Sequence, residues 1–291
     1  MADHRIPITI ADVVIDVASP LSASQLGIDP VLGPFLCEPA VSLGRVSLRW
    51  TESNDLRPRG RLVYDPGGVW RMYATESGHC AAIHYGDDSD ERPVRGVLYA
   101  NPGWDDLVLT ERPTGSGWRS LLALGAGELV LRSAILSSGG LVFHAASLDD
   151  GGRGVLLIGH AGAGKSTQLG LWMREPGVVG MNDDRVAARA THDGVWCYGT
   201  PWGGTADIAR NHTAPLRAMV LLEQAAETSI EPLAPATAAP LLLARTFLPY
   251  WDSSLMHLAL TNLDSLLKAV PVYRLCCRPD AEAVAAVRSV L

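Results

Sequence analysis

The segment 159–167, with the sequence GHAGAGKST, constrains the fold of this chain more than any other feature. It fits the pattern GxxxxGK[ST] at Gly159, Gly164, Lys165 and Ser166. In such a loop the glycines let consecutive backbone N–H groups point at phosphate oxygens, the lysine reaches the β- and γ-phosphates, and the hydroxyl binds Mg²⁺. The pattern therefore predicts a phosphate-binding P-loop, or Walker A motif, between a strand and a helix.

The flanking residues provide that context. The run VLLIG at 155–159 is uninterruptedly apolar, which is typical of a strand buried on both faces, and STQLGLWMRE at 166–175 indicates a helix. The positive end of the helix dipole would then face the phosphates. The residues expected to bind ATP are Gly159, His160, Ala161, Gly162, Ala163, Gly164, Lys165, Ser166 and Thr167.

Two adjacent carboxylates follow the P-loop helix after one short apolar run. Asp183 and Asp184 stand in MNDDRVAAR at 181–189, directly after VVGMN at 178–182. Phosphoryl transfer needs oxygen ligands for Mg²⁺ and a base for the attacking hydroxyl. We expect one aspartate to hold the metal with Ser166 and the other to act as the base, and the sequence does not decide which is which.

One histidine and a glycine-rich stretch are further candidates. His144 lies in LVFHAAS at 141–147, on the strand expected before the P-loop strand, where a histidine of the core is the commoner interpretation. The stretch CYGTPWGGTADIAR at 197–210 would form a loop that can approach a ligand, and arginines can stabilise charge on a transferring phosphoryl group. The substrate candidates are Gly199, Thr200, Trp202, Arg210 and Arg245.

The rest of the chain predicts a mixed α+β fold. We expect a β-rich N-terminal region, 1–120, and a P-loop catalytic region, 121–291. Their boundary is soft, and a single body accounts for the pattern as well as two domains do. In the first region β-prone runs alternate with turn residues, which favours an antiparallel meander. These runs lie at 46–50, 61–65, 69–74, 80–85 and 94–100.

In the second region the apolar spacing changes repeatedly between strand and helix periods. Residues 128–138 carry a helical stripe that ends at a glycine pair, and 225–240 reads as a loose segment rich in Ala, Pro and Thr. Further strands are expected at 141–147, 178–182, 185–190, 195–199, 216–223 and 272–277, and further helices at 253–269 and 280–290.

Charge, cysteines and termini limit the classes of function. The chain has 24 basic and 31 acidic residues, and its net charge of −7 predicts no cationic surface for nucleic acid or an anionic membrane. Its five cysteines have neither a zinc-site spacing nor a CxxC motif, and indicate free thiols in a reducing compartment. The start has no signal-peptide pattern and no apolar stretch reaches the length of a membrane span, so we expect a cytoplasmic protein.

Three motifs together resemble the catalytic core of HPr kinase/phosphorylase. They are HAASL at 144–148, VLLIGHAGAGKST at 155–167 and MNDDRVAAR at 181–189. That family has a histidine on a strand, a P-loop and an aspartate pair in this order, on a fold shared with ATP-dependent phosphoenolpyruvate carboxykinase. The family assembles into rings, so the resemblance also allows a homo-oligomer.

The resemblance implies a role for each matching residue. It makes His144 the active-site histidine, and Lys165 and Ser166 the P-loop pair. Asp183 and Asp184 become the acidic pair that binds metal and abstracts the proton. The family's P-loop usually continues with glutamate after Lys-Ser, whereas this chain has a threonine there.

The chain is also similar to HPr kinase-related proteins of about this length. They share GTPW at 199–202, LPYWD at 248–252 and VPVYRL at 270–275. Some of them stand beside genes for ribosomally made peptides, lasso peptides among them, and phosphorylate a serine of the precursor peptide. This resemblance implies an ATP- and Mg²⁺-dependent kinase that transfers the γ-phosphoryl group to a serine of a peptide or small protein.

Two other functions stay open at this stage. A kinase of a free small molecule, such as an amino acid or a sugar, would use the same residues, and competition by free serine against a peptide would distinguish it. A non-catalytic module that senses ATP would bind the nucleotide without acceptor-dependent release of ADP.

Overall fold

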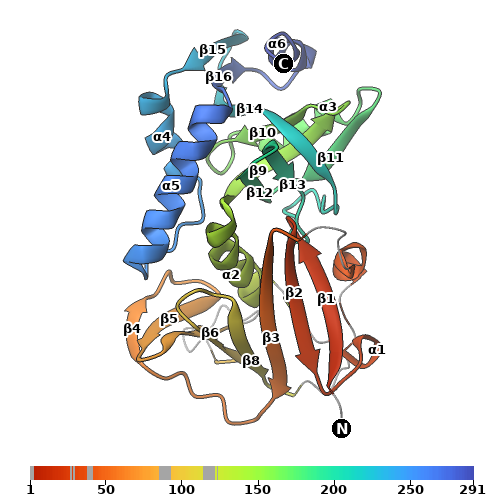
Figure 1. The fold of residues 1–291 in the computed structure, drawn as a ribbon. Coiled ribbons are helices and arrows are strands. Elements are labelled where there is room, and N and C mark those ends of the chain that lie inside the picture. The colour runs from red at the N-terminus through yellow and green to blue at the C-terminus, as the bar shows by residue number, and fades with distance from the viewer. Residues whose placement is uncertain are drawn as a thin grey trace. The chain divides into compact units, whose positions relative to one another are not determined.

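The computed structural model describes residues 3–26, 28, 30–37, 42–84, 93–113, 122 and 124–291 (Figure 1). The chain forms two compact units: Met1–Ser137 with Pro249–Ser253, and Ser138–Leu248 with Ser254–Leu291. Among the described residues each unit contains one eight-stranded sheet together with helices, so the fold is a mixture of α and β. The boundary expected near residue 120 lies outside the described residues.

The first unit is built on a sheet with the strand order β1-β2-β3-β8-β7-β6-β5-β4. Its strands are β1 (His4–Ile10), β2 (Val13–Ser19), β3 (Gly44–Glu52), β4 (Arg61–Tyr64), β5 (Trp70–Thr75), β6 (Gly78–Ile83), β7 (Gly96–Ala100) and β8 (Asp106–Glu111). Its helical segments are α1 (Ala23–Leu26), η1 (Pro30–Phe35), α2 (Leu124–Ala134) and η2 (Ile135–Ser138), of which α2 and η2 confirm the helical stripe expected at 128–138.

The expected meander is confirmed from β4 to β8, where consecutive strands pair antiparallel. The β2–β3 and β3–β8 pairs are parallel, so the expectation of antiparallel pairing was wrong for β3. The reason is topological: after β3 the chain crosses to β4 at the edge of the sheet and returns strand by strand to β8. Strands β1, β2 and β8 were not expected, and Tyr85, at the end of an expected strand, lies outside the described residues.

A short segment from late in the chain belongs to the first unit through aromatic packing. Within 249–253, Trp251 meets Trp70 edge to face, with the ring centroids 5.3 Å apart. The Arg132 guanidinium lies 4.9 Å from the centroid of Trp251 and 5.1 Å from that of Trp70. Such aromatic and cation–π contacts stabilise a packed cluster beyond the area that it buries.

The second unit has the strand order β10-β9-β12-β13-β14-β16-β15, and β11 pairs with β9. Its strands are β9 (Gly140–Asp150), β10 (Gly154–Ile158), β11 (Val178–Asn182), β12 (Arg185–Thr191), β13 (Gly194–Tyr198), β14 (Thr213–Gln224), β15 (Ser229–Leu233) and β16 (Val272–Cys277). Its helices are α3 (Lys165–Trp172), α4 (Pro235–Leu243), α5 (Ser253–Ala269) and α6 (Ala281–Arg288). These elements confirm the strands and helices expected between 141 and 290.

The strand pairings of this unit close into a ring. They run from β10 to β9, β12, β13 and β14, and β14 then pairs in parallel with β10. The ring forms because β9 and β14, with 11 and 12 residues, are long enough to change partners along their length. The P-loop leaves the ring at the end of β10.

The interpretation of 225–240 as a loose segment was wrong. It contains β15 and most of α4. The content of proline in this segment wrongly indicated a loop. Proline is compatible with the first turn of a helix, where Pro235 stands, and burial of Ala238 and Leu242 stabilises α4.

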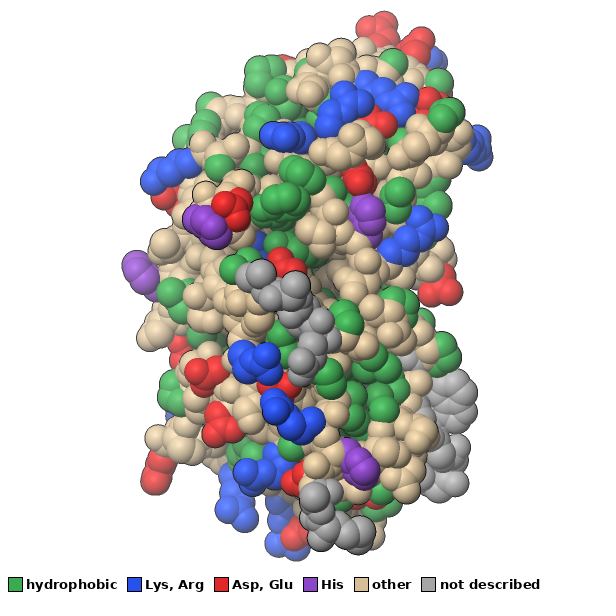
Figure 2. Space-filling view, turned by 45° about the vertical axis from the view of Figure 1, so that its right-hand side comes forward, with side chains coloured by type: hydrophobic (Ala, Val, Ile, Leu, Met, Phe, Trp, Pro, Cys, Tyr) green, Lys and Arg blue, Asp and Glu red, His purple; other side chains and the backbone are tan. Residues whose placement is uncertain are grey.

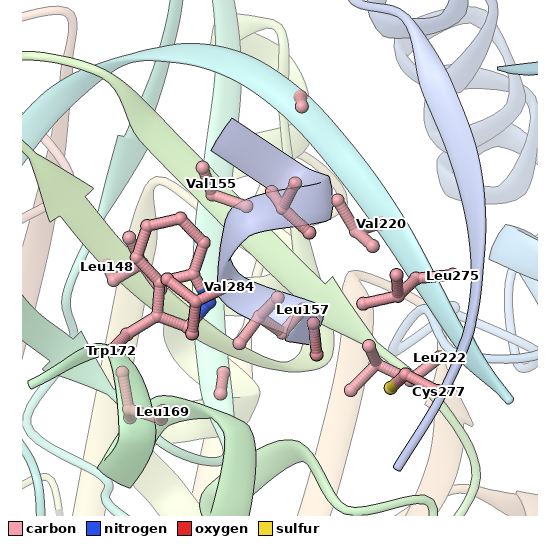
Figure 3. Packing of buried hydrophobic residues seen from close by; sticks show 14 of the residues in the cluster. Leu148, Val155, Leu157, Leu169, Trp172, Val220, Leu222, Leu275, Cys277 and Val284 are labelled. Carbon is pink, nitrogen blue, oxygen red and sulfur yellow. The ribbon is translucent and has the colours of Figure 1, made fainter. Parts of the chain in front are cut away.

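The core beside the P-loop is one hydrophobic cluster (Figure 3). Strands β9, β10, β14 and β16 contribute side chains from one face, and helices α3 and α6 cover that face. Trp172 of α3 is fully buried among them and lies 5.2 Å below the guanidinium of Arg288. Packing of α3 in this cluster fixes the helix that follows the P-loop.

The surface carries charges of both signs. On the face in Figure 2, Lys and Arg side chains lie among acidic ones rather than in a single cationic area. In the described part of the chain no helix has the length and apolar character needed to cross a membrane.

Removing the Trp172 indole is expected to destabilise the second unit. Trp172→Ala should lower the free energy of unfolding by about 3–5 kcal/mol, because a large buried side chain is lost and a cavity remains. Leu260→Ala, at a position 44% exposed on α5, is the control and should change it by less than about 0.5 kcal/mol. Urea unfolding followed by circular dichroism measures both, and equal effects would contradict this account of the core.

Candidate active site

Strand β9 places His144 where the strand changes partners. His144 is the last residue of β9 opposite β12, in register with Arg185, and Ala145 is the first opposite β10, in register with Ile158. The backbone N–H of His144 donates to the carbonyl of Arg245 at 2.7 Å, and that of Ala145 to the carbonyl of Asp184 at 3.0 Å. The main chain around this histidine is therefore held by three separate segments.

The P-loop has the backbone geometry that its glycines predict. Gly162 and Gly164 have φ angles of +81° and +98°, in the left-handed region that favours glycine. A Cβ at Gly159 would lie 2.7 Å from the Cβ of Ala163, so the loop closes too tightly for a side chain there. The loop is thus folded around its own backbone, and helix α3 begins at Lys165.

Lys165 points back into the site. Its Nζ donates to Nε2 of His144 at 3.0 Å and to the carbonyls of Gly159 at 3.1 Å and His160 at 3.3 Å, which occupies all three ammonium N–H groups. Burial lowers the pKa of Lys165; the carboxylate of Asp184 opposes this and the charge of Arg245 adds to it.

Asp184 completes a chain of contacts with these two residues. Its Oδ1 lies 2.7 Å from Nδ1 of His144, and its Oδ2 accepts from Arg185. Burial alone would raise the pKa of Asp184, but the hydrogen bond from His144 and the charge of Arg185 outweigh it, so the pKa lies below its ordinary value. Because Nε2 of His144 accepts from Lys165, the proton of a neutral imidazole is on Nδ1 and is donated to Asp184.

Arg185 and Phe247 border this chain of contacts, and sequence reasoning missed both. The Arg185 guanidinium lies 5.3 Å over the Phe247 ring, and the His144 ring meets the same phenyl edge to face at 6.4 Å. The sequence does contain a signal that could have identified Arg185, which is a basic residue directly after the aspartate pair. Phe247 has no comparable signal, because only the pairing of its segment with β9 brings it here.

Asp183, although adjacent in sequence, has different partners. Its Oδ1 accepts from the backbone N–H of Gly204 at 2.7 Å and of Ile208 at 3.3 Å, and its Oδ2 from that of Ala206 at 2.7 Å. The residue is 3% exposed, and a Cβ at Gly204 would lie 3.0 Å from Oδ2. This carboxylate fixes the loop that follows the GTPW stretch.

Asn182 is a second anchor that sequence reasoning did not single out. It is fully buried, and its Oδ1 accepts from the backbone N–H groups of Asp184 and Arg185, each at 2.8 Å. Its Nδ2 donates to the carbonyl of Thr200 at 2.9 Å, and the Thr200 hydroxyl donates to the carbonyl of Arg185 at 2.6 Å. The signal was an asparagine at a strand end, where its side chain can close a turn.

The structure places one of the substrate candidates near Lys165 and the others in or next to the loop at 199–210. Arg245 is near Lys165, whose pKa its charge lowers, and its carbonyl accepts from His144. Arg210 instead donates to the carbonyl of Gly180 on β11 at 3.0 Å. A Cβ at Gly199 would lie 2.0 Å from the carbonyl oxygen of Arg210, and Thr200 and Trp202 are buried, so these three residues shape the loop.

The donor atoms of the site suit phosphate and Mg²⁺. The P-loop offers backbone N–H groups and one ammonium group, which match phosphate oxygens. Mg²⁺ prefers oxygen ligands, and the Ser166 hydroxyl and the Asp184 carboxylate provide them. Asp184 fits this role because each of its oxygens has one bond to a protein group, whereas Asp183 already receives three amide N–H groups.

No family model matches this chain, and no curated protein matches it. Among solved structures it is similar to the HPr(Ser) kinase/phosphatase from Coxiella burnetii, with 14% sequence identity and a TM-score of 0.29. The similar region covers 51% of this chain and 88% of that one.

Loss of the Asp183 carboxylate is expected to free the loop that it holds. Asp183→Ala leaves three amide N–H groups without their acceptor and should lower the free energy of unfolding by about 3 kcal/mol. It should also speed proteolytic cleavage within 199–210, measured by mass spectrometry. Asp184→Ala is the matched control, since it removes no backbone partner, and cleavage that is equally slow in both variants would contradict the anchoring role.

Lys165 is expected to make the protein less stable at neutral pH. Since the folded state lowers the pKa of Lys165, the charged form costs stability in the folded protein; this cost is full below the lowered pKa, shrinks as pH rises above it, and is gone above the ordinary value of 10.5. Lys165→Met should therefore raise the thermal unfolding midpoint by a few degrees at pH 7, with a smaller gain near pH 10.5. Lys268→Met, at a side chain 74% exposed, is the control. A gain that does not depend on pH, or none, would refute the prediction.

Proposed function

We propose that this protein is an ATP-dependent kinase that transfers the γ-phosphoryl group to a serine hydroxyl of a peptide or small protein. The observation that carries the proposal is the chain of contacts from Asp184 through His144 to Lys165. It joins a carboxylate and an imidazole to the lysine of a P-loop, which is the residue that contacts the β- and γ-phosphates. The proposal includes a P-loop core like that of phosphoenolpyruvate carboxykinase and a cytoplasmic location.

The phosphate-binding roles follow from the donors present. The P-loop amides and Lys165 would hold the triphosphate, and Arg245 would add positive charge near the γ-phosphoryl group. Bound Mg²⁺, held by Ser166 and Asp184, would neutralise charge on the phosphates. Such positioning and charge neutralisation supply most of the catalysis in phosphoryl transfer.

The proton of the acceptor hydroxyl is assigned to His144. Asp183 is engaged by backbone amides and Asp184 is assigned to the metal, so the remaining acceptor at the site is Nε2 of His144. The hydrogen bond that Lys165 donates to Nε2 must first be redirected to a phosphate oxygen. Nε2 is then free to accept the proton of the serine hydroxyl. The serine oxygen then bonds to the γ-phosphorus, the bond to the β-phosphate oxygen breaks, the proton moves to His144 and ADP leaves.

The choice of a peptide as the proposed acceptor rests on the motif resemblance. GTPW, LPYWD and VPVYRL resemble segments of HPr kinase-related proteins, some of which phosphorylate a serine of a precursor peptide. The residues around His144 support transfer to a hydroxyl and do not select the molecule that carries it. A free amino acid or sugar, or no acceptor at all, are the alternatives that the experiment must separate.

The test is incubation of the protein with ATP, Mg²⁺ and a panel of HPr, free serine and serine-containing peptides encoded near its gene. Mass spectrometry should detect one added phosphate on a peptide. Lys165→Ala, His144→Ala and Asp184→Asn should each lower the rate by at least about 10³-fold, because each removes a contact to the reacting groups. Lys268→Ala, at a side chain 74% exposed on α5, is the control and should keep the wild-type rate.

Three results would contradict parts of this proposal. Phosphorylation of free serine in preference to peptides would indicate a small-molecule kinase. ATP binding without phosphate transfer to any acceptor, and without ADP release, would favour the ATP-sensing module. Full turnover by Lys165→Ala would refute the site itself.

A further inference from the structure

A cleft of about 380 Å³ adjoins the P-loop on the side where α3 begins. Its lining comes from three places in the second unit: the P-loop with the first turns of α3, the end of β14, and the residues after β16. None of the residues that form the chain of contacts at His144 is among them. The lining residues outside the P-loop are Gln168, Gln224, Ala225, Cys277, Arg278 and Pro279.

Hydrogen bonds fix the walls of this cleft. Nε2 of Gln224 donates to the carbonyl of Gly162 at 2.9 Å, which ties the P-loop to the end of β14. The N–H of Ala225 donates to the carbonyl of Cys277 at 3.1 Å, and Nε2 of Gln168 donates to that of Arg278 at 3.4 Å. These hydrogen bonds therefore join the three walls of the cleft to one another.

The direction of a bound triphosphate can be derived from the two sides of the P-loop. Lys165 contacts the β- and γ-phosphates in P-loops and here points toward His144, so the γ end faces that side. The opposite end of the triphosphate must then leave past the first turn of α3. Thr167, on that turn, lines the cleft.

The chemistry of the cleft suits a nucleoside. Its volume is in the range of small-molecule sites, which begin at about 300 Å³. Ala225 and Pro279 offer apolar surface, and the Arg278 side chain, 59% exposed, has a flat guanidinium that can stack on a base. The Thr167 hydroxyl can bond to a ribose.

We propose that this cleft is the nucleoside subsite, in which Arg278 and Ala225 contact the purine of ATP. This inference rests on the proposed function, because it assumes that the P-loop binds a nucleotide. It adds residues from the ends of β14 and β16 to the binding site, where no motif exists to identify them.

The test compares two ligands that share the triphosphate. Calorimetry measures the affinity of the protein for Mg²⁺-ATP and for Mg²⁺-tripolyphosphate, which lacks the nucleoside. Wild type should bind ATP at least tenfold more tightly. Ala225→Trp, which fills the cleft, should lower the ATP affinity at least tenfold and leave that for tripolyphosphate unchanged. Ala226→Trp, the same change at the next, exposed residue, is the matched control and should behave as wild type.

The outcomes separate this inference from the proposed function. If wild type binds neither ligand, the P-loop assignment fails and the subsite fails with it. If wild type binds both equally, or Ala225→Trp keeps the preference for ATP, phosphate binding stands and the subsite is refuted. If Ala225→Trp loses both ligands, Arg278→Ala decides, and wild-type affinity for ATP in that variant overturns the proposal.

Discussion

The hydrogen bond between Nζ of Lys165 and Nε2 of His144 joins the two halves of the site. One partner begins the helix after the P-loop, and the other stands on β9, where this strand changes partners. The contact is made by a buried ammonium group whose pKa burial lowers, so the fold disfavours the charged form of Lys165, which the proposed phosphate binding would need. Active sites commonly combine function with such a local loss of stability.

The neighbouring aspartates illustrate how backbone geometry separates identical side chains. The turn closed by Asn182 directs Asp184 toward His144 and Asp183 toward the loop at 204–208. Three amide donors engage one carboxylate, while the other meets an imidazole and Arg185. The two aspartates therefore differ in their hydrogen-bond partners because of the turn and the loop around them, and not because of their own chemistry.

The elements of the second unit were largely predictable because each has a strong local signal. The strand before the P-loop is continuously apolar, and the helix after it has both a glycine start and a buried stripe. Prediction failed where pairing partners are far apart in sequence, as in the parallel pairing of β3 with β8, and where burial stabilised α4 in a segment rich in proline. Local propensity does not contain these long-range contacts.

The sequence by itself determined the P-loop, its flanking strand and helix, and the identity of a histidine and an acidic pair as candidates, because these depend on residue type and spacing. Only the tertiary structure decided that Asp184 contacts His144 and Asp183 does not, that Arg185 and Phe247 border the site, and that a cleft formed by β14 and β16 adjoins the P-loop. These contacts join segments separated by tens of residues, and their geometry is set by strand register and buried hydrogen bonds.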